Sequence, residues 1–493
     1  MKAIKISIIS CLILLSGCYK DNNNYTVNPI NEVRITTSAD AYAVQQLSTL
    51  SIRPQLSYSL DSTDSYSYEW KIFTPNSSAV VPYSEILATT KDLNEIIYSP
   101  AREYNLIYTV INNRTGVRYF KEMRLTVNSG FYEGLVVAYN NGNQGELGFI
   151  RADNEVALNL MQAINDGPTD APILRTNTLI VGSIGLLNLT TRNNHYQIDV
   201  NEFRVLRDKS TLFSSPINQF SGGFLGANKL SFFDVPSDIY YITNGHVYAD
   251  MGIDFAGAMA NMYSQSFYYT GGDYNLFPFI FDGSGGTPIY FYDNLSKRLL
   301  QATYNGRSLS NVTRKTADVY DPGTINKTAV AAMAGYGSTA YFIMHDESSR
   351  YYVYTMSRNT TATANNILEV NLSAVPQFAN ARIFDSRDDQ RLIYYAVGNQ
   401  LYMYNLTNNS ASVVLSFSGN EQIADIQVYR PKLWQNSTYA DANRRLYVAT
   451  NNGQTGKVYQ YRLEENGSVH ATPDNEYTGF GAIVNIDYRN PNE

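Results

Sequence analysis

A strand–turn–strand pattern that returns about every 50 residues constrains this chain more than any other feature of its sequence. In residues 391–405, two apolar runs rich in β-favouring side chains flank the turn residues Gly398 and Asn399. Apolar and polar positions alternate in both runs, as they do in a strand whose two faces differ. The pattern therefore predicts a β-hairpin.

Related hairpins occur along most of the chain. One residue of each copy serves as a marker: Tyr240, Tyr290, Tyr341, Tyr394 and Tyr447 for the clear copies, and Val136 and Leu187 for two weaker ones. Successive markers lie about 50 residues apart, which is the period of a β-propeller blade. The seven copies predict seven blades, and the two weak copies leave rings of six or eight blades as alternatives.

The composition favours an all-β fold. The 493 residues include 41 Tyr and 21 Phe, and 16% are charged. Tyrosine suits strands because its ring packs while its hydroxyl stays in water, and abundant Asn and Gly suit tight turns. The net charge of −7 disfavours nucleic acid and purely electrostatic binding to anionic lipid, so we expect no nucleic acid partner.

The C-terminal strand is expected to close the ring. Each repeat has a strand ahead of its hairpin except the first, which follows directly on the N-terminal domain. Residues 482–491 resemble residues 423–431, the leading strand of the last repeat, because both contain Ile followed by Tyr-Arg and Pro. We predict that residues 129–493 form the propeller and that its last strand pairs into the first blade, which removes the exposed edge.

Residues 30–128 are expected to form a small β-sandwich. Alternating segments begin at Val33, Leu50, Tyr66, Tyr104 and Tyr119. Short strands at this spacing predict an immunoglobulin-like sandwich. The strand that contains Trp70 and the later stretch from Tyr108 to Gly116 resemble PKD-like domains, and this resemblance implies that Trp70 packs in the core.

The N-terminus has the pattern of a bacterial lipoprotein. A short basic region and an apolar core too short to span a bilayer precede Leu15-Ser16-Gly17-Cys18. This sequence resembles the lipobox, which implies that residues 1–17 are a signal peptide and that Cys18 carries lipid. The alternative is an ordinary secretory signal that ends near a chance cysteine.

The residues after Cys18 indicate where such a lipoprotein goes. Lys20-Asp21 resembles the signal that sends lipoproteins of the Bacteroidota to the outer face of the outer membrane. Residues 18–29 are polar and rich in turn formers, and we expect them to be a flexible tether. The predicted location is therefore the cell outer membrane, with the protein exposed at the surface and held by its lipid.

Aromatic side chains in two loops are the candidate ligand contacts. The enlarged, aromatic segment 254–274 contributes Tyr263, Tyr268, Tyr269 and Tyr274, and part of it is expected to form the outer strand of the third blade. The loop 431–440 contributes Trp434. Loops on a propeller commonly carry binding residues because the strands build the core. Local packing is the alternative role for Trp434 and for the tyrosines.

The sequence shows no catalytic motif. His195, His246 and His345 fall in or beside hairpin turns, where we expect exposed side chains too far apart to share a metal ion. Neither a Gly-x-Ser-x-Gly nor a His-Glu-x-x-His pattern occurs. We therefore expect no enzymatic activity, no metal and no cofactor, although a spatial pair of acids as in glycoside hydrolases remains an alternative.

A tether, a PKD-like domain and a propeller together resemble the PKD-like surface lipoproteins of Bacteroidota. The resemblance implies an accessory partner of SusC/SusD-type importers that captures a nutrient or helps to assemble the transporter. Oligopeptides are the first expectation for the ligand, since the chain has two Trp against 41 Tyr and lacks a Trp-rich platform for sugars. The alternatives are a glycan-binding protein, a surface propeller hydrolase or lyase, and a module that binds the transporter alone.

Overall fold

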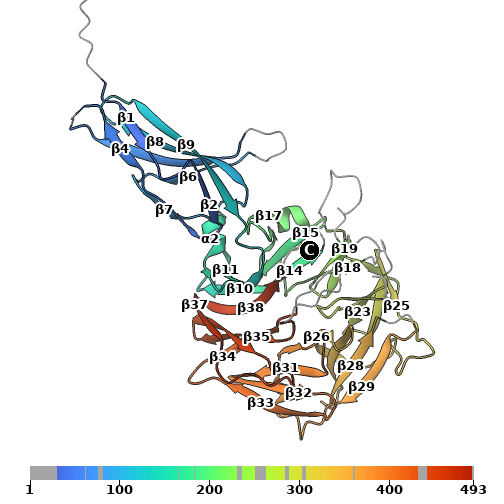
Figure 1. Cartoon of the computed structure of the whole chain (residues 1–493). Helices are drawn as coiled ribbons and strands as arrows, with labels where there is room; N and C mark the ends of the chain where they lie inside the picture. The colour runs from blue at the N-terminus through green and yellow to red at the C-terminus, as the bar shows by residue number, and fades with distance from the viewer. Residues whose placement is uncertain are drawn as a thin grey trace, which may run out of the picture. The chain divides into compact units, whose positions relative to one another are not determined.

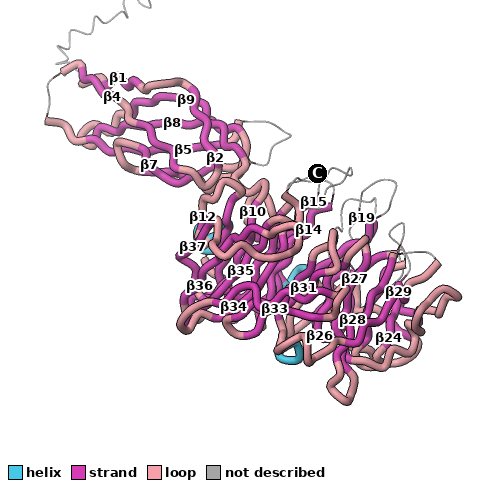
Figure 2. Tube along the Cα trace, turned by 60° about the horizontal axis from the view of Figure 1, so that its bottom comes forward, coloured by secondary structure: helices cyan, strands magenta, loops and turns pink. Residues whose placement is uncertain are grey.

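The computed structural model describes residues 30–60, 63–75, 82–165, 167–181, 184–229, 236–249, 263–283, 288–302, 307–358, 361–430 and 441–490. They divide into two compact units. The first contains the described residues of 1–42, 50–95 and 103–125, and the second contains 43–49, 96–102 and the described residues from 126 onward. Both units consist mainly of strands (Figure 2).

The N-terminal part is a PKD-like β-structure, as the sequence predicts. Its strands are β1 (Val33–Thr36), β2 (Ala41–Gln45), β3 (Thr49–Ile52), β4 (Gln55–Tyr58), β5 (Tyr66–Phe73), β6 (Ser84–Ala88), β7 (Leu93–Ile96), β8 (Glu103–Asn112) and β9 (Arg118–Asn128). A five-stranded sheet has the order β2-β9-β8-β5-β6, and β1 pairs with β4 and β3 with β7. The segment beginning at Leu50 forms two strands because Pro54, which has no N–H to donate, stands between them.

Trp70 lies in the core of this domain, which confirms the packing role expected for it. Its side chain is fully buried, and its ring stacks on Tyr108 with 4.3 Å between centroids. The indole N–H donates to the carbonyl of Thr90 over 3.1 Å. The buried indole therefore keeps its polar atom satisfied, as a buried tryptophan requires.

The second unit is a β-propeller. Its described residues form seven sheets, which Figure 1 shows arranged in a ring. Blade one comprises β38 (Ala482–Arg489), β10 (Gly134–Asn141), β11 (Gln144–Arg151) and β12 (Val156–Ala157), and β13 (Thr169–Asp170) pairs with β11. Blade two comprises β14 (Ile173–Val181), β15 (Ile184–Thr191), β16 (His195–Asp199) and β17 (Val205–Asp208), and blade three comprises β18 (Phe224–Lys229), β19 (Pro236–Thr243) and β20 (His246–Ala249). Blade four comprises β22 (Phe281–Asp282), β23 (Ile289–Asp293), β24 (Arg298–Ala302) and β25 (Ser308–Asn311), and β21 (Tyr268–Tyr269) pairs with β25.

The remaining blades are regular four-stranded sheets. Blade five comprises β26 (Thr328–Gly335), β27 (Thr339–His345), β28 (Tyr351–Ser357) and β29 (Ala364–Glu369); blade six, β30 (Ile383–Ser386), β31 (Leu392–Val397), β32 (Gln400–Asn405) and β33 (Ser410–Ser416); blade seven, β34 (Gln422–Val428), β35 (Arg445–Asn452), β36 (Thr455–Arg462) and β37 (Asn475–Phe480). The seven sequence markers all lie in the second strands of their blades, which confirms the prediction of seven blades. Within the described residues, three short helices interrupt the strands: α2 (Leu160–Ile164), α3 (Lys209–Leu212) and η2 (Phe378–Asn380).

The ring closes through the C-terminal strand, as predicted. β38 pairs antiparallel with β10, and Leu135 lies opposite Tyr488 in this register. Ile483, Ile486 and Tyr488 are buried. The first blade thus takes its inner strand from the end of the chain and its other strands from near the start of the unit.

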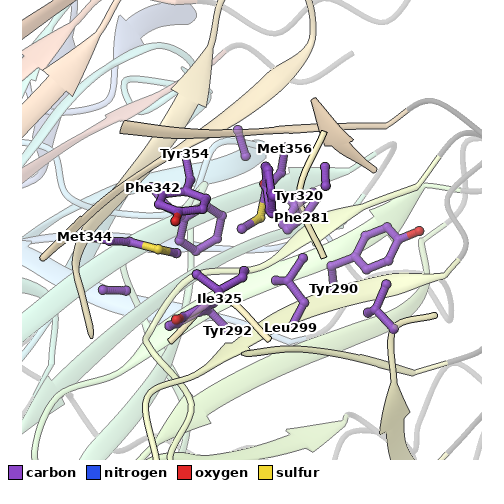
Figure 3. Packing of buried hydrophobic residues seen from close by; sticks show 14 of the residues in the cluster. Phe281, Tyr290, Tyr292, Leu299, Tyr320, Ile325, Phe342, Met344, Tyr354 and Met356 are labelled. Atoms are coloured by element: carbon purple, nitrogen blue, oxygen red, sulfur yellow. The ribbon is translucent and has the colours of Figure 1, made fainter. Parts of the chain in front are cut away.

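Apolar clusters fill the spaces between neighbouring blades. Figure 3 shows the cluster between blades four and five, where Tyr292 and Phe342 face each other with 5.9 Å between ring centroids. Similar clusters lie between the other neighbouring pairs. Because each tyrosine or phenylalanine ring removes a large apolar area from water, the aromatic composition is explained by interblade packing.

Polar side chains tie the inner strands to one another. The Asp385 carboxylate on β30 accepts the N–H of Val428 on β34 over 2.6 Å, and Asp425 on β34 accepts the N–H of Ile486 on β38 over 2.9 Å. Asp487 on β38 similarly accepts the N–H of Thr178 on β14. Inner strands have an open edge whose N–H groups require partners, and these carboxylates supply them.

Three local expectations need correction. The apolar residues at helical spacing between Asn154 and Ile164 predict a short helix, but α2 begins only at Leu160, because residues 156 and 157 pair with β11. Within the aromatic segment, Ser264 and Phe267 donate backbone N–H bonds to Ala249 and Val247 of β20, at the edge of blade three where an outer strand was expected. The regular strand β21 that follows pairs instead with β25 of blade four. His195 is fully buried rather than exposed, because Phe213 and Phe220, from the segment that follows blade two, pack around its ring.

Candidate functional site

The turns between the first and second strands of the blades lie on one face of the propeller. In an antiparallel sheet the first strand ends, and the second begins, at one edge. The N–H of Gly337 in blade five donates to the carbonyl of Asp388 in blade six over 3.1 Å. The Asp388 carboxylate accepts from the amide of Asn443 in blade seven over 2.7 Å. These edges therefore adjoin, and we call this side the first-turn face.

A small polar pocket lies on this face between the first and last blades. We call it the closure pocket; it is lined by Gly134, Ile150, Arg151, Ala152, Asn154, Arg445, Tyr447, Gln460, Asn475, Tyr477 and Tyr488. Its volume is about 160 Å³, comparable to a cavity that holds one benzene ring. The pocket can admit a group about as large as one amino-acid side chain.

The tyrosines of the closure pocket are hydrogen-bonded within the protein. Tyr488 donates its hydroxyl to Glu133 over 2.9 Å, and Tyr477 donates to Asn154 over 2.5 Å. Burial raises the pKa of both phenols above the ordinary range, so they stay protonated at neutral pH. These hydroxyl protons are already engaged and are not offered to a ligand.

The arginines of the closure pocket are also paired. Arg445 forms an ion pair with Asp441, and its guanidinium lies 4.9 Å from the ring centroid of Tyr429. Arg151 is buried and pairs with Asp153. Each positive charge thus has its own carboxylate, and the pocket is internally compensated.

A larger, open groove lies on the same face above blades five and six. We call it the rim groove; it is lined by Tyr336, Asp389, Gln390, Arg391, Leu392, Asn405 and Thr407. Its volume is about 480 Å³, within the range of roughly 300–1,000 Å³ common for small-molecule sites. The lining combines both signs of charge, two amides, a hydroxyl and an aromatic ring.

Asp389 is fixed in the rim groove by a buried arginine. The side chain of Arg387 has no exposed area, and its guanidinium donates to the two carboxylate oxygens of Asp389 over 2.8 and 2.7 Å. A third bond from Arg387 reaches the carbonyl of Glu464 in blade seven over 2.9 Å. Such a bidentate pair holds the carboxylate in one orientation and offsets its charge.

Arg391 and Tyr336 also line the rim groove. The Arg391 guanidinium lies 5.7 Å from the Tyr336 ring centroid, a distance at which a cation is attracted to an aromatic face. Tyr336 is 44% exposed, and its backbone N–H donates to the hydroxyl of Tyr341 over 3.1 Å. The aromatic support for Arg391 is therefore itself anchored in blade five.

The acids on the inner strands are engaged in holding the strands together. Burial, the main cause, and the charge of Asp385 raise the pKa of Asp425 to about 7. Besides the strand contacts described above, Asp425 accepts the N–H of Ile426 over 2.9 Å, and Asp385 pairs with Arg430 at 2.5 Å. All four carboxylate oxygens thus have donors, which explains their presence without a reaction.

The predicted ligand residues have different surroundings. Tyr263, Tyr269 and Tyr274 are buried in interblade clusters, so packing accounts for them in this structure. Tyr268 is 66% exposed but lies on β21, apart from both hollows. Trp434 and Cys18 lie outside the described residues. Ligand binding by any of these aromatics stays a prediction.

Sequence reasoning missed the rim groove. The pair Asp388-Asp389 is typical of a turn, but the run from Arg387 to Arg391 places five polar residues together, which is unusual in a chain with 16% charged residues. Tyr336 precedes this run by a whole repeat, and only the packing of two blades brings it beside Arg391. The cluster of charges between Arg387 and Arg391 could have indicated a site from the sequence, whereas nothing in the sequence connects Tyr336 with it.

The described residues contain no group of three or more His, Cys, Asp or Glu side chains suited to hold a metal ion. In the same residues, no helix is long and apolar enough to cross a bilayer.

Comparisons with known proteins agree with this architecture. Residues 18–169 match the model of the PKD-like family. No curated protein matches the chain at a significant level.

Comparison with solved structures matches this chain to the two proteins that follow. A quinoprotein alcohol dehydrogenase-like protein from Bacteroides thetaiotaomicron is 13% identical, with a TM-score of 0.50 over 91% of this chain and 96% of that one. The WD40 domain of coronin from Toxoplasma gondii is 11% identical, with a TM-score of 0.37 over 72% of this chain and 79% of that one. At such identity the first likeness shows the fold alone. The chain is thus an all-β protein in which a PKD-like N-terminal domain precedes a β-propeller.

Proposed function

We propose that this protein is a lipid-anchored protein of the outer cell surface that captures short peptides for a SusC/SusD-type importer and catalyses no reaction. The lipobox-like residues ending at Cys18 support the anchor. The match of residues 18–169 to the PKD-like family is in keeping with a surface lipoprotein. The rim groove is the observation that carries the binding role.

The rim groove suits a peptide for three reasons. Its volume of about 480 Å³ has room for a few residues. The Gln390 amide nitrogen donates to the carbonyl of Glu465, and the Asn405 amide oxygen accepts the N–H of Thr407. The Gln390 amide oxygen, the Asn405 amide N–H groups and the Thr407 hydroxyl can therefore exchange hydrogen bonds with peptide N–H and C=O groups. Tyr336, with 44% of its surface exposed, offers an apolar face to a side chain.

A blocked groove tests the binding role. Thr407 is exposed, so a Thr407→Trp substitution should leave the fold intact while its indole fills the groove. We expect peptide affinity to fall at least about tenfold, the effect of losing about 1.4 kcal/mol of binding free energy. Isothermal titration of the chain lacking residues 1–18, against peptide and oligosaccharide pools, measures this.

The matched control is Thr455→Trp, at the turn between β35 and β36 on the opposite face of the propeller. Its affinity should equal that of the unmodified protein. Binding of oligosaccharides in place of peptides would favour the glycan alternative. Equal peptide affinity in both variants would place the peptide site outside the rim groove.

Association with a transporter is tested on the full-length protein. We expect it to copurify with a SusC/SusD-type complex from detergent-solubilised membranes. A Cys18→Ser variant, which cannot accept the lipid, should appear in the soluble fraction without that complex. Recovery of the lipidated protein alone would contradict the transporter partnership.

A further inference from the structure

Arg391 is a cation whose charge is not matched by a neighbouring acid. Among the residues that the structure describes, no carboxylate forms an ion pair with it, whereas the nearby Arg387 and Arg444 pair with Asp389 and Glu465. Its guanidinium rests against the ring of Tyr336, and its backbone carbonyl accepts the N–H of Leu406 over 3.0 Å. The side chain is thus supported from one side and lines the groove.

The acids near Arg391 do not cancel its charge. Both oxygens of Asp389 are occupied by Arg387, whose side chain is fully buried, so this ion pair is nearly neutral as a unit. Asp388 does not line the groove and accepts a bond from Asn443. Glu465 is 90% exposed and screened by water. The rim groove therefore carries a local positive charge at Arg391 although the whole chain is negative.

A guanidinium in this setting is suited to a carboxylate. Its planar set of N–H donors matches the two oxygens of a carboxylate, and the pair forms charge-assisted hydrogen bonds. Stacking on an aromatic ring reduces the freedom that the arginine would lose on binding. A free carboxylate occurs at the C-terminus of a short peptide and also on a uronic acid, and both are small enough for the groove.

We propose that Arg391, supported by Tyr336, binds a carboxylate group that is part of the captured ligand. This inference rests on the proposed function in assigning the group to the C-terminus of a peptide. Asn405 and Thr407, on the same side of blade six, lie where they can contact the main chain that precedes the carboxylate. Asp389 shapes the groove but does not bind the anion.

The experiment compares ligands that differ in one group. Titrations use the chain lacking residues 1–18 and three forms of trialanine: the free acid, the C-terminal amide, and the N-acetylated free acid. Glucuronate and glucose form a second pair. We expect both free acids of trialanine to bind, and the amide to bind about 10- to 100-fold more weakly, as the loss of a charge-assisted hydrogen bond predicts.

Variants show whether Arg391 is the residue responsible. Arg391→Met should reduce the affinity for the free acid to that of the amide, while Arg391→Lys should retain part of the difference because it keeps the charge but not the planar fork. Tyr336→Phe should behave as the unmodified protein, and Tyr336→Leu should weaken free-acid binding. Arg444→Met, which removes another arginine from the first-turn face, is the matched control and should change nothing.

The outcomes separate this inference from the proposed function. If the acid and the amide bind equally and Arg391→Met has no effect, the carboxylate site is refuted while peptide capture stands. If glucuronate binds through Arg391 and the peptides do not, the carboxylate site is supported and peptide capture is refuted. If no carboxylate ligand binds and the circular dichroism spectrum is normal, the inference is overturned.

Discussion

A chain that ends at Gly481 should fail to form the closed propeller and should aggregate. The deletion removes β38, which supplies the inner strand of blade one and buries Ile483 and Ile486. It also breaks bonds to two other blades, because Asn485 donates to the carbonyl of Thr176 in blade two and Asn451 in blade seven donates to that of Ile483. The inner edge of β10 would then be exposed and able to pair with another chain.

Size-exclusion chromatography and far-ultraviolet circular dichroism measure this outcome. A chain that ends at Asn490 retains β38 and is the control, which should melt as the full chain does. Adding a synthetic peptide of residues 482–490 to the truncated chain should restore part of the folded signal. If the truncated chain is monomeric and melts at the temperature of the control, ring closure by β38 does not determine stability.

Acid should destabilise the propeller through His195. Its ring is fully buried between Phe213, Phe220, Tyr241 and Tyr263. One nitrogen, Nδ1, lies 3.0 Å from the hydroxyl of Thr190, and Nε2 has no hydrogen-bond partner among the residues that the structure describes. Burial lowers the pKa of His195 to about 3, so the folded protein keeps this ring neutral.

Stability should be lost between the pKa of histidine in the unfolded chain, about 6.5, and the pKa of His195 in the folded protein, about 3. Above about pH 6.5 the ring is neutral in both states and the free energy of unfolding does not depend on it. As the pH falls below that value, His195 binds a proton in the unfolded chain but stays neutral in the folded chain. Stability then falls by about 1.4 kcal/mol per pH unit until about pH 3. Between pH 7 and pH 5 the loss should be about 2 kcal/mol.

Urea denaturation of the unmodified protein and of His195→Phe, at pH 7 and pH 5, measures this difference. Phenylalanine fits the aromatic surroundings, and Thr190 keeps its 2.9 Å bond to the hydroxyl of Tyr241. The variant should lose about 2 kcal/mol less than the unmodified protein between the two pH values. His470→Gln, which removes an exposed histidine, is the control and should show the full loss. An equal pH response in His195→Phe would show that burial of this ring does not set the acid sensitivity.

The success of the repeat count and the error at His195 have related physical causes. A hairpin such as β31–β32 is held by a turn at Gly398 and by side chains that alternate along adjacent strands. These are local properties, and they recur because every blade solves the same packing problem. The burial of His195 depends on Phe213 and Phe220 folding back over blade two, which no periodic pattern in the strands predicts.

The candidate site also combines features that local sequence predicts with features that depend on contacts between blades. Three charged residues, Arg387, Asp389 and Arg391, lie within five positions of the sequence, but each has a different role in the structure. Arg387 is buried and neutralised, Asp389 is its partner, and Arg391 lines the groove on Tyr336. Which charge is buried depends on contacts with blades five and seven, so the sequence run alone could not assign the roles.

By itself, the sequence determined the fold class and the number of blades, because periodicity, turn residues and aromatic content reflect interactions between near neighbours. The closing strand was predicted from its likeness to residues 423–431, and the core position of Trp70 from the resemblance to PKD-like domains. The tertiary structure alone decided where the hollows lie, that Arg391 lines the rim groove without an ion pair among the described residues, and that His195 is buried. These properties arise where residues from different repeats meet, and the distances that define them exist only once the ring has closed.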